Sequence, residues 1–159
     1  MELVDDRINA ELAEMNADTI NNKFLLFKIA DEIYGIEISI VQEIINVVPI
    51  TQVPSTPNFL KGIINLRGDV LSIVDVRIRF MMEEREYDDQ TCIIVVEQNG
   101  EKIGIVVDQV HEVKYIPKAK LTPPPSAKLA YQNQFIRSLG HVDDEVVLLI
   151  DAEDLLHHD

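Results

Sequence analysis

From residue 24 onward, short apolar runs alternate with turn-forming residues along most of the chain. The runs are rich in Val and Ile and are bounded by Gly, Asn, Asp or Pro, a pattern typical of many-stranded antiparallel folds. The chain is therefore predicted to be all-β. We expect strands at Phe24 to Ile29, Ile33 to Ile38, Phe59 to Leu66, Val70 to Val74, Thr91 to Val96, Lys102 to Val107, Phe135 to Gly140 and Glu145 to Ile150.

The segments between these strands have their own signals. Asn99-Gly100 is the strongest hairpin signal, because a type I′ turn needs positive φ at both central residues. We expect a surface loop over residues 117–134, because Pro123-Pro124-Pro125 cannot donate hydrogen bonds to a strand ladder. Short helical pieces are expected at Ile40 to Ile44, Val76 to Phe80 and Ala152 to His157.

The first 21 residues differ from the rest of the chain. They are acidic, and Ile8, Leu12 and Met15 are spaced as on one face of a helix. A short helix and an unstructured tail fit this segment equally well. We assign it no chemistry.

A sequence pattern occurs twice in the chain. An ungapped shift of 69 positions places residues 32–44 on residues 101–113, with five of thirteen positions identical. A shift of 76 places Phe59 on Phe135 and the segment from Val70 on the segment from Val146. The seven additional residues must be inserted between the matched segments, where the proline-rich stretch lies. Chance is the rival explanation, because apolar alternation alone aligns many Val and Ile pairs.

The duplication predicts three parts: an acidic tail (1–21), a first β-barrel subdomain (22–88) and a second (89–159) that includes the proline-rich loop and a C-terminal helix. Units of this size bury only about 60% of their unfolded surface, so we expect the two to pack together and share a core. The groove between them is a natural docking place for a ligand or a partner helix. Whether the units exchange strands is left open.

Composition narrows the classes of partner. With 14 basic and 28 acidic side chains, the formal charge is -14, which repels phosphate backbones and argues against nucleic acid. No apolar run approaches the ~18 residues of a membrane span, and no secretion signal is present, so we expect a cytoplasmic protein without direct membrane insertion. The single cysteine, Cys92, lies in an apolar run and is expected to be buried.

Catalytic patterns are absent from the sequence. Neither the Walker pattern nor the dinucleotide fingerprint occurs, and the histidines His111, His141, His157 and His158 lack metal-ligand spacing. We therefore expect no catalytic residues, no metal and no cofactor. Because 28 acids make paired carboxylates inevitable, a small carboxylate-dependent hydrolase stays as a remote alternative.

Three segments together resemble one known family. Residues 61–77, KGIINLRGDVLSIVDVR, closely resemble the signature of CheW proteins and of the CheW-like domain in CheA kinases. Tyr34-Gly35-Ile36 followed by Val41-Gln42-Glu43-Ile44, and then Gly104-Ile105-Val106-Val107-Asp108, resemble the family's other recurring stretches. The resemblance runs from about Phe24 to Leu156.

The resemblance implies a fold and a function. The fold is two packed five-stranded SH3-like β-barrels, without catalytic activity. The function is a chemotaxis adaptor that couples the cytoplasmic tip of chemoreceptors to the regulatory domain of the histidine kinase CheA, recruited to membrane-bound receptor arrays. The alternative is a related scaffold that binds only the kinase or competes with another coupling protein.

The resemblance also marks Arg67 and Glu43 as important for coupling. Arg67 is predicted on a turn from which its guanidinium can reach Glu43, placed on the helical turn after the second strand. The alternative is that both are ordinary exposed charges, whose pairing is worth only about 0–1 kcal/mol. Gly62, beside this motif, is expected to serve the backbone first and a partner second. The other predicted partner-binding positions, which either line the groove or lie in the core, are Val41, Ile44, Val106, Val107 and Val113.

Overall fold

The computed structural model describes residues 6–124 and 134–157. Its helices are α1 (Asp6–Ala13), α2 (Val76–Arg79) and α3 (Ala152–His157), and its 3-10 turns are η1 (Ile38–Ile40) and η2 (Lys118–Lys120). Its strands are β1 (Lys23–Ile29), β2 (Glu32–Glu37), β3 (Val41–Asn46), β4 (Leu60–Leu66), β5 (Asp69–Asp75), β6 (Cys92–Gln98), β7 (Glu101–Val107), β8 (Gln109–Tyr115), β9 (Leu121–Thr122), β10 (Ile136–Val142) and β11 (Glu145–Ile150). None of the helices in these ranges has the length and apolar character that crossing a membrane requires.

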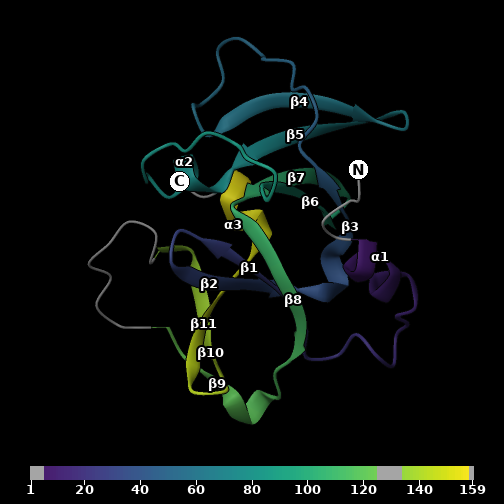
Figure 1. The fold of residues 1–159 in the computed structure, drawn as a ribbon, viewed down its shortest axis with the longest axis vertical. Helices are drawn as coiled ribbons and strands as arrows, with labels where there is room; N and C mark the ends of the chain where they lie inside the picture. The colour runs from purple at the N-terminus through teal and green to yellow at the C-terminus, as the bar shows by residue number, and fades with distance from the viewer. Residues whose placement is uncertain (1–5, 125–133, 158–159) are drawn as a thin grey trace.

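The strands form two sheets, one above the other in Figure 1. Sheet A has the order β8-β1-β2-β11-β10-β9, and sheet B has the order β3-β6-β7-β5-β4. Sheet B closes because the chain beyond β3 reaches the opposite edge, where Thr51 and Ile63 exchange hydrogen bonds of 2.9 and 2.8 Å. Sheet A closes similarly, since β9 follows β8 and pairs with β10. The predicted all-β fold of two packed barrels is confirmed, and β9 adds a sixth strand to sheet A.

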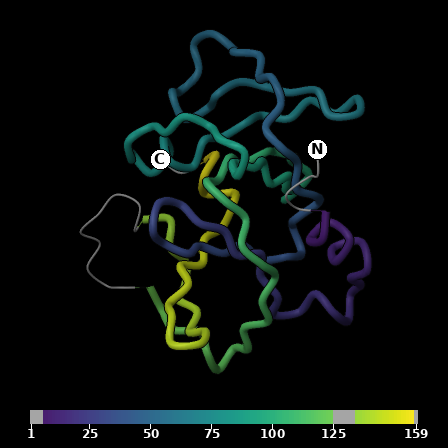
Figure 2. The backbone as a smooth tube through the Cα atoms, viewed as in Figure 1, coloured from purple at the N-terminus to yellow at the C-terminus, as the bar shows by residue number. Residues whose placement is uncertain are grey.

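Each sheet takes strands from both halves of the chain. In sheet A, β1 and β2 join β8, β9, β10 and β11, whereas in sheet B, β6 and β7 join β3, β4 and β5. In Figure 2 the dark blue hairpin of β1 and β2 accordingly lies beside the yellow C-terminal strands. The halves therefore exchange their first hairpins, and a boundary between residues 88 and 89 does not separate the two sheets.

The pairing registers reproduce the sequence repeat. A shift of 69 carries the start of β1 and β2 onto the start of β6 and β7, and a shift of 76 carries β4 and β5 onto β10 and β11. The irregularities also correspond, because the ladders skip Gln42 in β3 and His111 in β8, and Lys61 in β4 and Arg137 in β10. Chance alternation of Val and Ile would not place β-bulges at equivalent positions. The internal duplication is therefore a property of the fold.

The two barrels share a core. Strands β1 and β6 are buried on both faces, which is why their sequences are continuous apolar runs instead of alternating ones. One face of β1 packs in a cluster shared by both sheets, through Leu25, Phe27 and Ile29, and the other packs within sheet A. Cys92, at the start of β6, is buried in the shared cluster as predicted.

The helix predicted over Ile40 to Ile44 is wrong, and strand β8 was not predicted. Residues from Val41 onward form β3, after the short turn η1. The bulge at Gln42 inserts one residue, so Val41 and Ile44 stand three positions apart and still face the same core. That spacing is also found on one face of a helix. The equivalent bulge at His111 gives Val110 and Val113 the same spacing, so the sequence did not predict β8 as a strand.

The tail and the proline-rich segment contain more structure than expected. Residues 6–13 of the acidic tail form α1, and Ile8 is buried. Within the predicted surface loop, Leu121 and Thr122, which precede the three prolines, form β9 and pair with β10. Residues 1–5 of the tail, 125–133 of the loop, and His158 lie outside the described residues.

Candidate partner-binding site

Arg67 lies at the tip of the β4–β5 hairpin. Leu66 pairs with Asp69, so Arg67 and Gly68 are the two central residues of the turn, with φ of 50° and 92°. Such a turn requires positive φ at both positions, which Gly68 adopts without strain. The side chain of Asn65 accepts a 3.0 Å hydrogen bond from the Gly68 N–H and fixes the turn. The hairpin therefore holds the Arg67 side chain outward.

Glu43 of β3 forms an ion pair with Arg67. The predicted proximity of the two residues is thus confirmed, although Glu43 lies on a strand and not on a helical turn. The pair joins the two edges of sheet B, since β3 and β4 stand at opposite ends of its strand order. The Arg67 side chain remains 67% exposed and that of Glu43 29% exposed, so the pair contributes only about 0–1 kcal/mol to stability.

A second ion pair stands beside the first. Lys102 of β7 donates a 2.9 Å hydrogen bond to Asp69, and this bond raises the pKa of Lys102 above its usual value, although the Arg67 charge opposes the shift. Next to Asp69, Val70 is 62% exposed. We call Glu43, Arg67, Asp69, Val70 and Lys102 the β4–β5 tip. An exposed apolar side chain surrounded by charges resembles the centre and rim of a protein interface.

Gly62 is buried and serves the backbone. Its φ is 146°, and an added Cβ would overlap the carbonyl oxygen of Thr51, which closes the barrel at this point. The residue is covered by the segment after β3 and offers no surface to a partner in this conformation. Its place in the recurring motif is explained by barrel closure.

The apolar candidates lie in the core. Val41, Ile44 and Val107 are buried in the shared cluster, and Val113 packs against that cluster while partly exposed. Val106 belongs to a separate cluster within sheet B. The structure thus brings four of the five together and separates the fifth.

Helix α1 covers part of this cluster, which the sequence did not reveal. Ile8 is 3% exposed and belongs to the cluster, and Leu12 and Met15 pack against it. Asn9 donates a 2.8 Å hydrogen bond to the Ile44 carbonyl and accepts one of 2.9 Å from the Ile44 N–H. The spacing of the apolar residues pointed to a helix, but nothing in the sequence pointed to β3 as its place.

A partly buried charge cluster was also missed. The Arg77 guanidinium donates to Asp108 at 2.7–3.0 Å, and Asp108 also accepts from the Ala30 N–H at 2.7 Å. Burial alone would raise the pKa of Asp108, but the bonds from Arg77 and Ala30 outweigh it and lower that pKa. Arg77 ends the recurring motif, yet its partner is 31 residues away and no local signal links them.

The carboxylates of this region are structural. Asp75 is buried, caps α2 by accepting from the Ile78 N–H, and accepts a 2.6 Å hydrogen bond from Tyr87. Burial first, and then that bond, raise the pKa of Tyr87. Asp75 and Asp108 line a cavity of about 10 Å³, close to the space of one water molecule. Such a cavity cannot admit a glycoside or another sizeable substrate.

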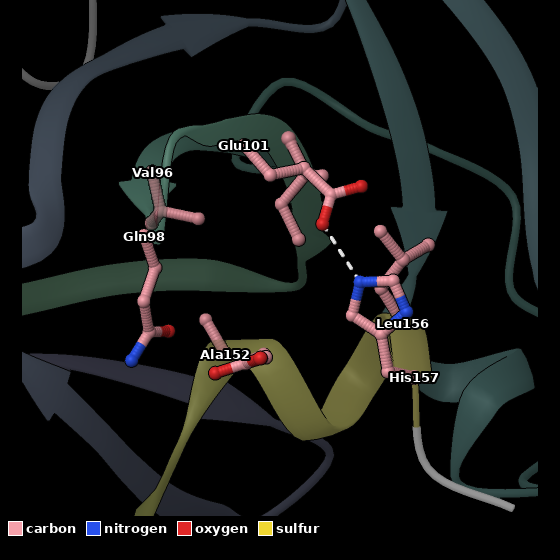
Figure 3. A pocket seen from close by; sticks show the side chains of 8 residues that line it. Val96, Gln98, Glu101, Ala152, Leu156 and His157 are labelled. Carbon is pink, nitrogen blue, oxygen red and sulfur yellow. Dashed lines mark hydrogen bonds and ion pairs between the residues drawn. The ribbon is translucent and has the colours of Figure 1, made fainter.

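A second small cavity lies between α3 and the β6–β7 hairpin, where Glu101 and His157 point toward each other (Figure 3). The Nε2 atom of His157 lies 2.7 Å from the Oε1 atom of Glu101, and the side-chain amide of Asn99 donates a 2.7 Å hydrogen bond to Glu153. These contacts fasten α3 to β7. Across residues 6–124 and 134–157, no three His, Cys, Asp or Glu side chains gather closely enough to hold a metal ion.

Comparison with known proteins adds to this geometry. The family model described as "CheW-like domain" matches residues 23–159. The chain is 33% identical over 147 residues to "Chemotaxis protein CheW" of Klebsiella aerogenes, covering 92% of this chain and 89% of that protein. It is 31% identical over 137 residues to "Chemotaxis protein CheW" of Helicobacter pylori, covering 86% and 82%. The crystal structure of "scaffolding protein TtCheW" from Thermoanaerobacter tengcongensis superposes with a TM-score of 0.80 at 36% identity, covering 87% of this chain and 94% of that one.

Proposed function

Since the chain belongs to the CheW-like family, it is a chemotaxis coupling adaptor between chemoreceptors and the kinase CheA, and we propose that it contacts the receptors' cytoplasmic tip and the regulatory domain of the kinase. The family is a non-enzymatic scaffold, so the carboxylate-dependent hydrolase is set aside. We further propose that the protein works in the cytoplasm, recruited to membrane-bound receptor arrays.

The β4–β5 tip carries this proposal. It presents Arg67, two thirds exposed, beside exposed Val70 on a hairpin fixed by its own turn. A guanidinium held in place can exchange its weak internal partner for a carboxylate of another protein, because the Glu43 pair contributes little to folding. Arg67 and Glu43 are therefore proposed as partner-contacting residues.

The kinase assay tests the proposal. Purified protein is mixed with a CheA-type kinase and receptor-bearing membranes, and kinase autophosphorylation is followed with and without it. The wild type should give stimulation that depends on receptor, and Arg67→Glu should reduce it about tenfold or more while the protein stays folded. Arg137→Glu is the matched control, because Arg137 is also an exposed, ion-paired arginine (60% exposed) on the other repeat.

Exchanging the two charges separates contact from stability. If Arg67 serves only to hold Glu43, the double variant Glu43→Arg with Arg67→Glu restores an ion pair and coupling returns. If the pair contacts a partner, the double variant remains defective. Equal activity of wild type and folded Arg67→Glu would remove the β4–β5 tip from the proposed site.

A scaffold that binds only the kinase is the second candidate. It shares the fold and differs in receptor binding alone. Sedimentation with receptor-bearing membranes in the absence of kinase separates the two, because only the coupling adaptor should sediment.

A further inference from the structure

Helix α1 lies on apolar positions singled out as candidate partner contacts. Ile8 is buried in the same cluster as Val41 and Ile44, and Leu12 of the helix packs against that cluster, as does Met15 just after the helix. The opposite face, with Arg7, Ala10 and Glu11, is exposed. An amphipathic helix with apolar residues along one face is one common occupant of an apolar groove in another protein.

Asn9 holds the helix at the free edge of a strand. Strand β3 is an edge strand of sheet B, paired with β6 on one side only. The amide of Asn9 satisfies both the N–H and the carbonyl of Ile44 on the other side. A single side chain thus covers the backbone edge directly beside Glu43, the residue that pairs with Arg67. In Figure 1, α1 accordingly lies next to β3.

The helix is held by few contacts. It has eight residues, of which Ile8 alone is buried, while Leu12 is half-buried. A helix this short is not stable by itself in water, so its folding depends on its docking. Few buried side chains and short length are the properties of a segment that opens before the rest of a protein.

From these observations we propose that α1 is an intramolecular occupant of a helix-docking surface formed by β3 and the shared core, and that a helix of the chemoreceptor tip takes its place. The inference rests on the proposed coupling function and adds its regulation: the surface is closed by α1 in the free protein. The apparent affinity for the receptor helix is then the affinity of the open form multiplied by the fraction of molecules in which α1 has opened.

Full-length variants test this exchange. Ile8→Asp removes the buried contact, and Ala10→Asp adds the same charge on the exposed face of the same helix as the matched control. The probe is a soluble cytoplasmic chemoreceptor fragment that contains the helical tip, with affinity measured by titration calorimetry. We expect Ile8→Asp to bind about tenfold more tightly than wild type, the factor for a surface open about a tenth of the time, and Ala10→Asp to bind like wild type.

Asn9→Ala is the second variant, since it removes two hydrogen bonds without placing a charge in the core. It should raise affinity about two- to fivefold and speed hydrogen exchange at the Ile44 amide; it carries the test if Ile8→Asp does not fold. Equal affinity of wild type and the folded variants, or weaker binding by them, overturns the exchange while leaving the adaptor function intact. Binding by none of the proteins, wild type included, overturns both the exchange and receptor coupling.

Discussion

Arg77 and Asp108 are joined by three hydrogen bonds of 2.7, 2.8 and 3.0 Å, with both side chains mostly buried. Arg77 lies in α2 of the first repeat, and Asp108 lies between β7 and β8 of the second. Through its bond from the Ala30 N–H, Asp108 also holds the β1–β2 turn. One carboxylate therefore fastens the exchanged hairpin to both halves of the chain.

Replacing Asp108 should destabilise the fold. Asp108→Asn keeps the shape but leaves the Arg77 guanidinium without its ionic partner, which we expect to cost about 2–4 kcal/mol. Urea unfolding measures the change, and Asp69→Asn is the control because its pair with Lys102 is exposed and worth less than about 1 kcal/mol. An equal effect of the two substitutions would show that burial does not strengthen the Arg77 pair.

The same carboxylate should make stability depend on pH in the acid range. Its pKa is lowered in the folded protein, so its contribution is present above the unfolded value of about 3.9 and is lost as the pH falls through the folded value. The difference in unfolding free energy between wild type and Asp108→Asn should hence be constant above about pH 5 and shrink below about pH 4. A difference that grows on acidification would contradict the lowered pKa.

Gly62 should tolerate no side chain. Gly62→Ala places a methyl group on the Thr51 carbonyl oxygen and forces φ of 146° on alanine, so we expect a loss of about 3 kcal/mol or more. Gly100→Ala is the matched control, since its φ is 79° but nothing lies within 4 Å of the added carbon. That variant should lose only about 1–2 kcal/mol, and thermal or urea unfolding compares the two. Equal losses would show that backbone strain, and not barrel closure, requires Gly62.

His157 should titrate above the ordinary range for histidine. Its hydrogen bond to Glu101 raises the pKa of His157, so protonation of the imidazole strengthens the attachment of α3 to β7. This stabilisation is fully present below the unfolded pKa of about 6.5 and is lost as the pH rises through the pKa of the folded protein. An NMR titration of the His157 imidazole checks this, with Glu101→Gln expected to lower the midpoint. Glu145→Gln removes an equal charge elsewhere and should leave it unchanged; if Glu101→Gln also leaves it unchanged, the contact does not form in solution.

The Arg67–Glu43 pair should matter less for stability than for coupling. In a double-mutant cycle with alanine at both positions, we expect a coupling energy below about 1 kcal/mol, because the guanidinium is largely exposed. Urea unfolding of the four proteins gives this number. A coupling energy above about 2 kcal/mol would make the pair a structural clamp and would explain a defect of Arg67→Glu without any partner contact.

Local physics made much of the fold readable from the sequence. Apolar runs at β1 and β6 predicted strands because burial on both faces leaves little room for polar residues. Asn99-Gly100 predicted a turn because few other residues adopt positive φ. The duplication was visible since equivalent strands keep equivalent patterns. Arg67 and Glu43 were found together because they stand in recurring motifs, not because their spacing of 24 residues implied contact.

Long-range pairing decided the rest. The bulge at Gln42 gave β3 the spacing of a helix, since the period of a strand holds only while its ladder is regular. Likewise, the spacing of Ile8, Leu12 and Met15 was compatible with a helix or with an unstructured tail, and did not say where a helix would dock. The exchange of hairpins and the bond between Arg77 and Asp108 depend on which surfaces meet after folding. The sequence by itself determined most of the strands, the repeat and the net acidic charge. Only the tertiary structure decided which strands share a barrel and what covers β3, because those choices depend on burial between segments far apart in the chain.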